Sequence, residues 1–230
     1  MKKVVLFDVD GTLVLTGGAG GRAMTRAFQD LFSVSDAFQH IPFPGRTDAR
    51  ILSDALAAHR IPTDAPALAS FRERYLEHLR AELAKPGPRK GVMPGVRSLL
   101  AALALRSDVV VALLTGNYED GARMKLEYFD LWRYFVCGAF GDEMQDRNSL
   151  FPVALARIEA RDGPLVPASA AVVVGDTPLD VACAAASGAR SLAVATGSYP
   201  ADELRRAGAD LVFDDLGDTR EVLRALFVSA

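Results

Sequence analysis

Residues 3–13 read KVVLFDVDGTL, in which a short apolar run is followed at once by Asp8 and Asp10. A continuous apolar run bounded by polar residues is typical of a strand buried on both faces of a parallel sheet. In open parallel sheets, ligands bind beyond the carboxyl ends of the strands. The stretch therefore predicts a buried strand at residues 3–9 that carries two carboxylates to the functional edge of a sheet.

Other apolar runs of the same kind follow along the chain. They lie at residues 109–114, 135–138, 170–174 and 192–195, and a weaker one lies at residues 210–213. Helical patterns alternate with them, at residues 93–105, 120–129, 151–161, 178–187, 202–207 and 219–227. Because strands that alternate with helices form βαβ units, we expect an α/β fold with a Rossmann-like, doubly wound parallel sheet.

One segment interrupts this alternation. Residues 20–83 show no strand pattern, and their apolar residues recur every three or four positions, as expected for helices. A glycine cluster at residues 17–21 and the stretch PGPRKG at residues 86–91 flank the segment, and both are typical of domain boundaries. We therefore predict an all-helical cap at residues 16–87, inserted in an α/β core of residues 1–15 and 88–230.

Composition excludes several classes of protein. The chain has 230 residues, of which 50% are hydrophobic, so it is not intrinsically disordered. Its 26 basic and 29 acidic residues give a net charge of −3, which predicts no nucleic-acid partner. No apolar stretch approaches the roughly 20 residues of a membrane helix, and the N-terminal apolar run is too short for a secretory leader. We expect a cytoplasmic protein that does not bind a membrane.

Two more apolar runs are followed by residues whose side chains can take part in catalysis or binding. Thr115, Gly116 and Asn117 follow one of them, and Asp176 and Asp180 follow another. If these strands lie beside the first, four carboxylates meet at one edge, which is untenable without a cation. Carboxylate and other oxygen ligands suit Mg²⁺. The carboxylates predicted for this magnesium site are Asp8, Asp10, Asp176 and Asp180.

These segments carry a family resemblance. The sequences DVDGTL at residues 8–13, TGN at residues 115–117 and GDTPLD at residues 175–180 occur in this order, each after a predicted strand. The pattern resembles the haloacid dehalogenase superfamily, and the helical insertion is similar to the cap of its phosphoglycolate phosphatase and β-phosphoglucomutase branch. Dehalogenases of the superfamily have an aromatic residue at the position of Asp10, so the aspartate favours phosphate chemistry.

The resemblance implies a phosphoric monoester hydrolase. Such an enzyme would be a Mg²⁺-dependent phosphatase that acts on a small phosphorylated metabolite, similar to phosphoglycolate or a sugar phosphate. Asp8 would be the nucleophile and would form an aspartyl-phosphate. Asp10 would protonate the leaving alcohol and then accept a proton from water, while its backbone carbonyl would bind the metal. Thr115, Gly116 and Asn117 would hold the phosphoryl oxygens.

The chain departs from the family pattern at one position. The family has a lysine before its fourth strand, where the basic residue here is Arg147. An arginine supplies the same charge with a different geometry, so Arg147 is the first candidate for catalysis and phosphate binding. Lys125 is the alternative. In the cap, Arg22, Arg46 and Arg50 are candidates for binding an anionic leaving group.

Two other functions remain open. A phosphosugar mutase of the same superfamily would use the same nucleophile and metal. A slowly hydrolysing, aspartate-phosphorylated signalling protein is the second alternative, because the usual lysine is replaced by Arg147. In each case the partner is a small phosphoester, and the chain is expected to be a monomer or a homodimer.

Overall fold

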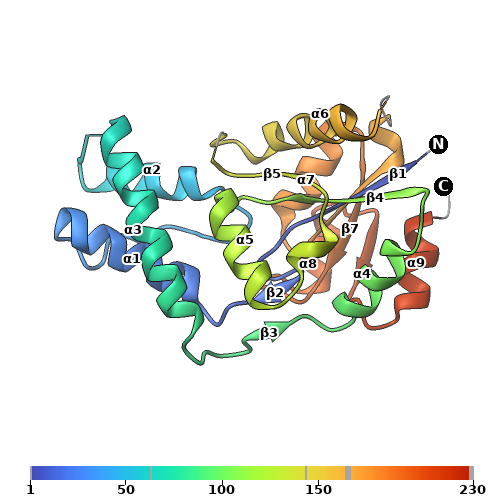
Figure 1. The fold of residues 1–230 in the computed structure, drawn as a ribbon, viewed down its shortest axis with the longest axis horizontal. Coiled ribbons are helices and arrows are strands. Elements are labelled where there is room, and N and C mark those ends of the chain that lie inside the picture. Colours follow the sequence, from blue (N-terminus) through green and yellow to red (C-terminus); the bar gives the residue numbers. More distant parts are fainter. Residues whose placement is uncertain (1, 63, 143, 164–166, 228–230) are drawn as a thin grey trace.

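The computed structural model describes residues 2–62, 64–142, 144–163 and 167–227. Its main element is a six-stranded sheet in the order β5-β4-β1-β6-β7-β8, in which every neighbouring pair is parallel (Figure 1). The strands are β1 (Lys3–Phe7), β4 (Val109–Leu114), β5 (Gly138–Ala139), β6 (Ala171–Gly175), β7 (Arg190–Val194) and β8 (Leu211–Phe213). The predicted fold class, an α/β protein with a parallel Rossmann-like sheet, is confirmed.

Helices cover both faces of the sheet, which explains why β1 is apolar throughout. On one face, Val5 and Phe7 share a buried cluster with α4 (Val96–Ala104), α5 (Glu119–Tyr128) and α9 (Thr219–Phe227). On the other face, Val4 and Leu6 pack with α6 (Leu150–Asp162) and α7 (Pro178–Ser187). Helix α8 (Ala201–Arg206) contributes Leu204 to a smaller cluster with β7. Alternate residues of β1 therefore face two hydrophobic layers.

The edge strand β5 differs from its prediction. The sequence predicts a strand over residues 135–138, but β5 contains only Gly138 and Ala139. Phe135 instead follows a 3-10 helix and packs edge-on against Phe7, with 6.1 Å between the ring centroids. The apolar character of the segment thus reflects packing beneath the sheet as much as strand pairing.

Three helices occupy the segment predicted as the cap, at the end of the molecule away from the chain termini (Figure 1). They are α1 (Ala19–Phe32), α2 (Asp48–Ala58) and α3 (Ala65–Leu83), and they share one buried cluster that includes Phe28, Ile51 and Phe71. This shared cluster supports the proposed cap boundaries at residues 16 and 87, which stay a prediction. None of the helices in the described ranges is long and apolar enough to cross a membrane.

The two linkers between this segment and the sheet pair with each other. Strand β2 (Val14–Leu15) runs antiparallel to β3 (Gly91–Val92), with Val14 opposite Val92 and Leu15 opposite Gly91. The sequence did not predict this pair, because two residues are too few to give a periodic pattern.

A buried carboxylate joins the first and third helices of the cap. Glu82, near the end of α3, is 1% exposed. Its oxygens accept hydrogen bonds from Arg22 Nε at 2.6 Å and Lys85 Nζ at 2.5 Å, and Arg26 Nε lies 3.3 Å away. The hydrogen bonds from Lys85 and Arg22 lower the pKa of Glu82 from 4.5 to about 2.

We expect Glu82→Gln to lower the free energy of unfolding at pH 7 by about 2 kcal/mol, because it removes charge-assisted hydrogen bonds. A lowered carboxyl pKa stabilises the fold above the unfolded-state value, and this contribution is lost as the pH falls toward the folded-state value. The difference in free energy of unfolding between variant and parent should therefore shrink as the pH falls from 4.5 to 2. Urea unfolding at pH 7 and at about pH 3 measures it. Glu77→Gln, at an exposed ion pair with Arg74, is the control, and an equal loss in both variants would contradict the prediction.

Candidate active site

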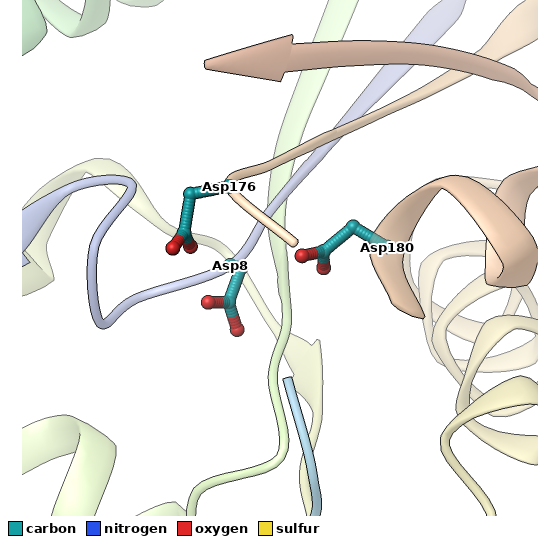
Figure 2. A group of neighbouring side chains, drawn as sticks. All are labelled: Asp8, Asp176 and Asp180. Atoms are coloured by element: carbon teal, nitrogen blue, oxygen red, sulfur yellow. The ribbon is translucent and has the colours of Figure 1, made fainter. Parts of the chain in front are cut away.

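Three carboxylates from two segments meet beyond the carboxyl ends of β1 and β6. Asp8 follows β1, Asp176 follows β6, and Asp180 lies in the first turn of α7. One oxygen of each lies within 4.8 Å of one oxygen of each of the others, and all three residues are buried (Figure 2). Figure 2 shows the side chains of Asp176 and Asp180 pointing toward Asp8 from the neighbouring strand end and helix. The structure therefore brings these three predicted site residues together.

The loop after β1 is shaped to fit against this cluster. Gly11 has φ +86°, a left-handed conformation that side chains disfavour. A Cβ atom at this position would lie 2.6 Å from Cγ of Asp176. Thr12 Oγ1, next in the chain, donates to Asp176 Oδ1 at 3.0 Å. The glycine thus allows the loop to approach Asp176, and the threonine orients that carboxylate.

Arg147 is the cation that contacts Asp8. It lies in a 3-10 helix (Arg147–Ser149) before α6 and is 5% exposed. Its Nη2 donates to Asp8 Oδ1 at 2.9 Å and to Asp180 Oδ1 at 2.5 Å, and its Nη1 donates to the Gly45 carbonyl at 3.0 Å. Burial raises the pKa of Asp8 to about 6, and the opposing charge of Arg147 limits the rise.

Asp180 is held from a second side by the start of its own helix. Its Oδ2 accepts hydrogen bonds from the backbone nitrogen of Thr177 at 3.0 Å and from Thr177 Oγ1 at 2.7 Å. Thr177 is the N-cap of α7, and the two residues form a capping box. Asp180 therefore positions Arg147 in addition to lying in the carboxylate cluster.

The cluster has the charge and the donor atoms that a divalent cation requires. Three buried carboxylates face one guanidinium, so the ionised cluster has two negative charges for a cation to balance. Burial and the neighbouring charges of Asp8 and Asp180 raise the pKa of Asp176 well above its usual range. Oxygen ligands in such a set suit Mg²⁺ or a similar hard cation. The Asp10 carboxylate, predicted as a fourth ligand residue, is not part of this cluster.

Asp10 belongs to a second polar group with Lys125 and Asn117. Asp10 Oδ2 accepts from Lys125 Nζ at 2.6 Å and from Asn117 Nδ2 at 2.9 Å. Lys125 Nζ also donates to Asn117 Oδ1 at 2.5 Å, and Lys125 is 4% exposed. Arg147 and Lys125, which the sequence offered as alternatives, thus occupy the same site and contact different aspartates.

The predicted phosphate-binding loop follows β4. Gly116 and Asn117 line a cavity between the sheet edge and the cap, whereas Thr115 is fully buried and is not part of the lining of this cavity. Thr115 Oγ1 accepts a hydrogen bond from Asn117 Nδ2 at 2.8 Å, and the backbone nitrogen of Asn117 points to the same hydroxyl at 3.4 Å. Thr115 therefore orients Asn117 in this structure, and its direct contact with phosphate stays a prediction.

A cavity of about 310 Å³ lies between the sheet edge and the cap. The sheet edge contributes the two aspartates after β1, and the cap contributes residues from all three of its helices. Of the three cap arginines predicted to bind a leaving group, only Arg46 lines the cavity. Arg46 and Arg50 both bind Asp54, and Arg22 binds Glu82. All three guanidinium groups therefore have carboxylate partners.

Asp48 is a cavity residue that sequence analysis missed. It is the first residue of α2, and only its place after an N-cap threonine marks it in the sequence. Its Oδ2 accepts the backbone N–H of Tyr118 at 2.9 Å, and its own N–H donates to the Gly116 carbonyl at 2.7 Å. Burial raises the pKa of Asp48 to about 7, although the nearby charge of Lys125 opposes the rise.

The cap segment and strands β1, β4, β5 and β6 lie wholly or partly within one family pattern, whereas β7 and β8 follow it. The model of the haloacid dehalogenase-like hydrolases matches residues 5–185, which include all three carboxylates of the cluster. This chain is a haloacid dehalogenase-like hydrolase. The family predicted from the three strand-end motifs is confirmed.

Relatives of known name cover nearly the full hydrolase. A phosphoglycolate phosphatase of Rhodospirillum rubrum is 33% identical over 229 residues, covering 95% of this chain and 90% of the relative. The crystal structure of a hydrolase from Pseudomonas syringae has a TM-score of 0.71 at 20% identity and covers 99% of this chain and 100% of its own. CbbY from Rhodobacter sphaeroides in complex with phosphate has a TM-score of 0.70 at 21% identity, covering 95% and 96%. The structures share the fold, and the predicted class, a phosphoric monoester hydrolase, is confirmed.

We expect Arg147→Ala to lower the free energy of unfolding by about 3 kcal/mol, because it leaves Asp8 and Asp180 buried without a cation. Arg147→Lys should be destabilised less, since it keeps the charge. Urea unfolding of both variants without added metal measures the effect. Arg133→Ala, at an exposed arginine paired with Asp130, should cost less than about 1 kcal/mol. Equal losses at positions 133 and 147 would contradict the prediction.

Lys125 should position Asp10, so Lys125→Met should lower kcat for an alkyl phosphate by about 10- to 100-fold with little change in KM. The loss should be smaller for p-nitrophenyl phosphate, because its leaving group departs without a proton. Phosphate release from both substrates measures the difference. Arg123→Met, at an exposed residue of the same helix paired with Glu127, is the control. An equal loss on the two substrates would argue against this role.

Proposed function

We propose that this hydrolase is a Mg²⁺-dependent phosphatase that acts on a small phosphorylated metabolite through an aspartyl-phosphate intermediate on Asp8. The observation that carries the proposal is the buried cluster of Asp8, Asp176 and Asp180 beside the cavity, with two negative charges in excess of Arg147. The proposed nucleophile and cation site would thus adjoin the cavity for the substrate.

In the first step, an Asp8 carboxylate oxygen attacks the phosphorus atom, and the bond from phosphorus to the leaving oxygen breaks. Asp10 gives its proton to that oxygen, so the product leaves as an alcohol. The hydrogen bonds from Lys125 and Asn117 both go to Asp10 Oδ2, which leaves Oδ1 to carry the proton. Lys125 and Asn117 thereby fix the direction in which the acid points.

In the second step, water attacks the phosphorus atom of the aspartyl-phosphate. Asp10, now ionised, takes a proton from that water, and the bond between phosphorus and the Asp8 oxygen breaks. Inorganic phosphate leaves and both aspartates return to their starting states, so the cycle consumes one phosphoester and one water. Arg147 stays on Asp8 through Nη2 and supplies positive charge beside the phosphoryl group.

Asp8, Asp176 and the backbone carbonyl of Asp10 would hold the metal, with Asp180 behind them. When bound, Mg²⁺ offsets the repulsion between the anionic nucleophile and the anionic substrate. Thr12 and Asp180 act on this site indirectly, Thr12 by orienting Asp176 and Asp180 by holding Arg147.

The alternatives have less support. A phosphosugar mutase needs a second phosphate site, but the three cap arginines, predicted to bind an anionic leaving group, bind Glu82 and Asp54. A slowly hydrolysing signalling protein has no need for a positioned acid and base, whereas Asp10 is held by two neighbours. The names of the relatives also support hydrolysis.

We expect Asp8→Asn to lower kcat by at least about 10³-fold, because the amide cannot act as the nucleophile. Phosphate release should stop in a chelator and return when Mg²⁺ is added. A panel of phosphoesters, including p-nitrophenyl phosphate, measures both effects. The control is Asp108→Asn, an exposed aspartate at the opposite end of β4 that pairs with Arg106. Turnover that survives Asp8→Asn, or that does not need a metal, would refute the mechanism.

A further inference from the structure

The part of the cavity formed by the cap is largely apolar. Met24 from α1, Ile51 from α2 and Tyr75 from α3 line it, and each is at most 2% exposed. Phe43, in the loop between α1 and α2, adds an aromatic ring. A leaving group in this cavity therefore meets a hydrophobic surface on the side away from the metal cluster.

Asp48 is a buried acidic residue on this surface. Its N–H binds the Gly116 carbonyl, and its Oδ2 binds the N–H of Tyr118, so core segments hold it at both its backbone and its side chain. Within the described residues, Asp48 has no ion-pair partner, and the charge of Lys125 acts on it only from a distance. A fixed acidic group thus faces the space where a leaving group would lie.

Most of the cations around the cavity are already paired with other carboxylates. Among the described residues, Arg46, Arg89, Lys125 and Arg147 line the cavity. Three of them bind carboxylates: Asp54 holds Arg46, Asp10 holds Lys125, and Arg147 bridges Asp8 and Asp180. The fourth, Arg89, is exposed on the segment between α3 and β3. The enclosed region beside Asp48 therefore favours neutral or positively charged groups.

We propose that Asp48 determines substrate specificity by accepting a hydrogen bond from a hydroxyl or ammonium group of the leaving alcohol and by disfavouring leaving groups that carry a carboxylate or a second phosphate. This inference rests on the proposed phosphatase function. The carbon atoms of the leaving group pack against Met24, Ile51 and Tyr75. The preferred substrate class is thus a phosphoester of a polyhydroxy alcohol or an amino alcohol.

The physical basis is the low dielectric constant around the buried carboxylate of Asp48. A carboxylate of the substrate placed beside a buried carboxylate is repelled strongly there. A hydroxyl or ammonium donor satisfies Asp48, whereas a leaving group without a donor leaves it desolvated and unpaired. Sites built on such a buried polar group discriminate well against substrates that fail to pair with it.

Three phosphoesters of similar size test the proposal directly. Their leaving groups differ in charge: 2-phosphoglycolate carries a carboxylate, 2-hydroxyethyl phosphate a hydroxyl, and phosphoethanolamine an ammonium. We expect kcat/KM for phosphoglycolate to be at least about 10-fold below the values for the other two. Assays at pH 8 keep Asp48 ionised, because this is above its pKa of about 7.

Asp48→Asn should narrow the differences in kcat/KM among the three phosphoesters. The variant should hydrolyse phosphoglycolate faster and phosphoethanolamine more slowly, each by about 5-fold or more in kcat/KM. Asp30→Asn makes the same change in charge at a cap residue bound to His78 outside the cavity, and it should leave the ratios unchanged. If Asp48→Asn does not fold, the three substrates with the parent enzyme still decide the question.

The results that would overturn the inference are distinct from those that would overturn the function. A parent enzyme that prefers phosphoglycolate, and loses that preference in Arg89→Ala, would place an anion-binding group at Arg89 and refute the role of Asp48. Equal ratios in the parent and Asp48→Asn would also refute it. If no phosphate is released from these three esters or from p-nitrophenyl phosphate, the phosphatase function fails, and the inference fails with it.

Discussion

The electrostatic repulsion among three buried carboxylates is the constraint on which the rest of this structure depends. Asp8, Asp176 and Asp180 lie together because parallel strands end at one edge of the sheet. In water they would separate, but here the strand ends and the first turn of α7 hold them. Arg147 compensates part of their charge, and the remainder creates affinity for a divalent cation. A divalent cation would relieve this repulsion, and it would also offset the charge of an anionic substrate.

The same arginine connects this charge cluster to the cap. Arg147 Nη1 binds the carbonyl of Gly45, three residues before Asp48. The hydrogen bond between Thr47 Oγ1 and the Gln145 carbonyl, at 3.1 Å, lies beside it. The loop that leads into α2 therefore contacts the segment that carries Arg147. The hydrogen bonds that hold this cap loop against the core therefore also help to position Arg147.

Much of the fold follows from local sequence patterns. The apolar runs located five of the six strands of the main sheet to within about two residues at each end, because strands buried on both faces have no polar positions. The meeting of Asp8 with Asp176 followed from strand order, since both lie at strand ends. These features depend on neighbouring residues or on one simple rule of topology.

Local sequence patterns did not predict features that depend on contacts between residues far apart in the sequence. Lys125 and Asp10 are 115 residues apart in the chain, and only the folded structure shows their contact. The carboxylate partners of Arg46 and Arg22 are likewise set by helix packing in the cap. The sequence therefore did not show whether these arginines were paired with a carboxylate or available to bind a substrate. Asp48 resembled an ordinary first-turn acid, and its burial comes from contacts across the cavity.

The pairing of β2 with β3 has a consequence for how such enzymes diversify. The chain crosses between core and cap twice, and the crossings are hydrogen-bonded neighbours, with Val14 opposite Val92. Insertion of one residue in either linker would shift the register and turn the paired side chains to the opposite face. A cap from another protein could therefore be exchanged only together with both linkers, because the hydrogen bonds between β2 and β3 join the two ends of the inserted segment.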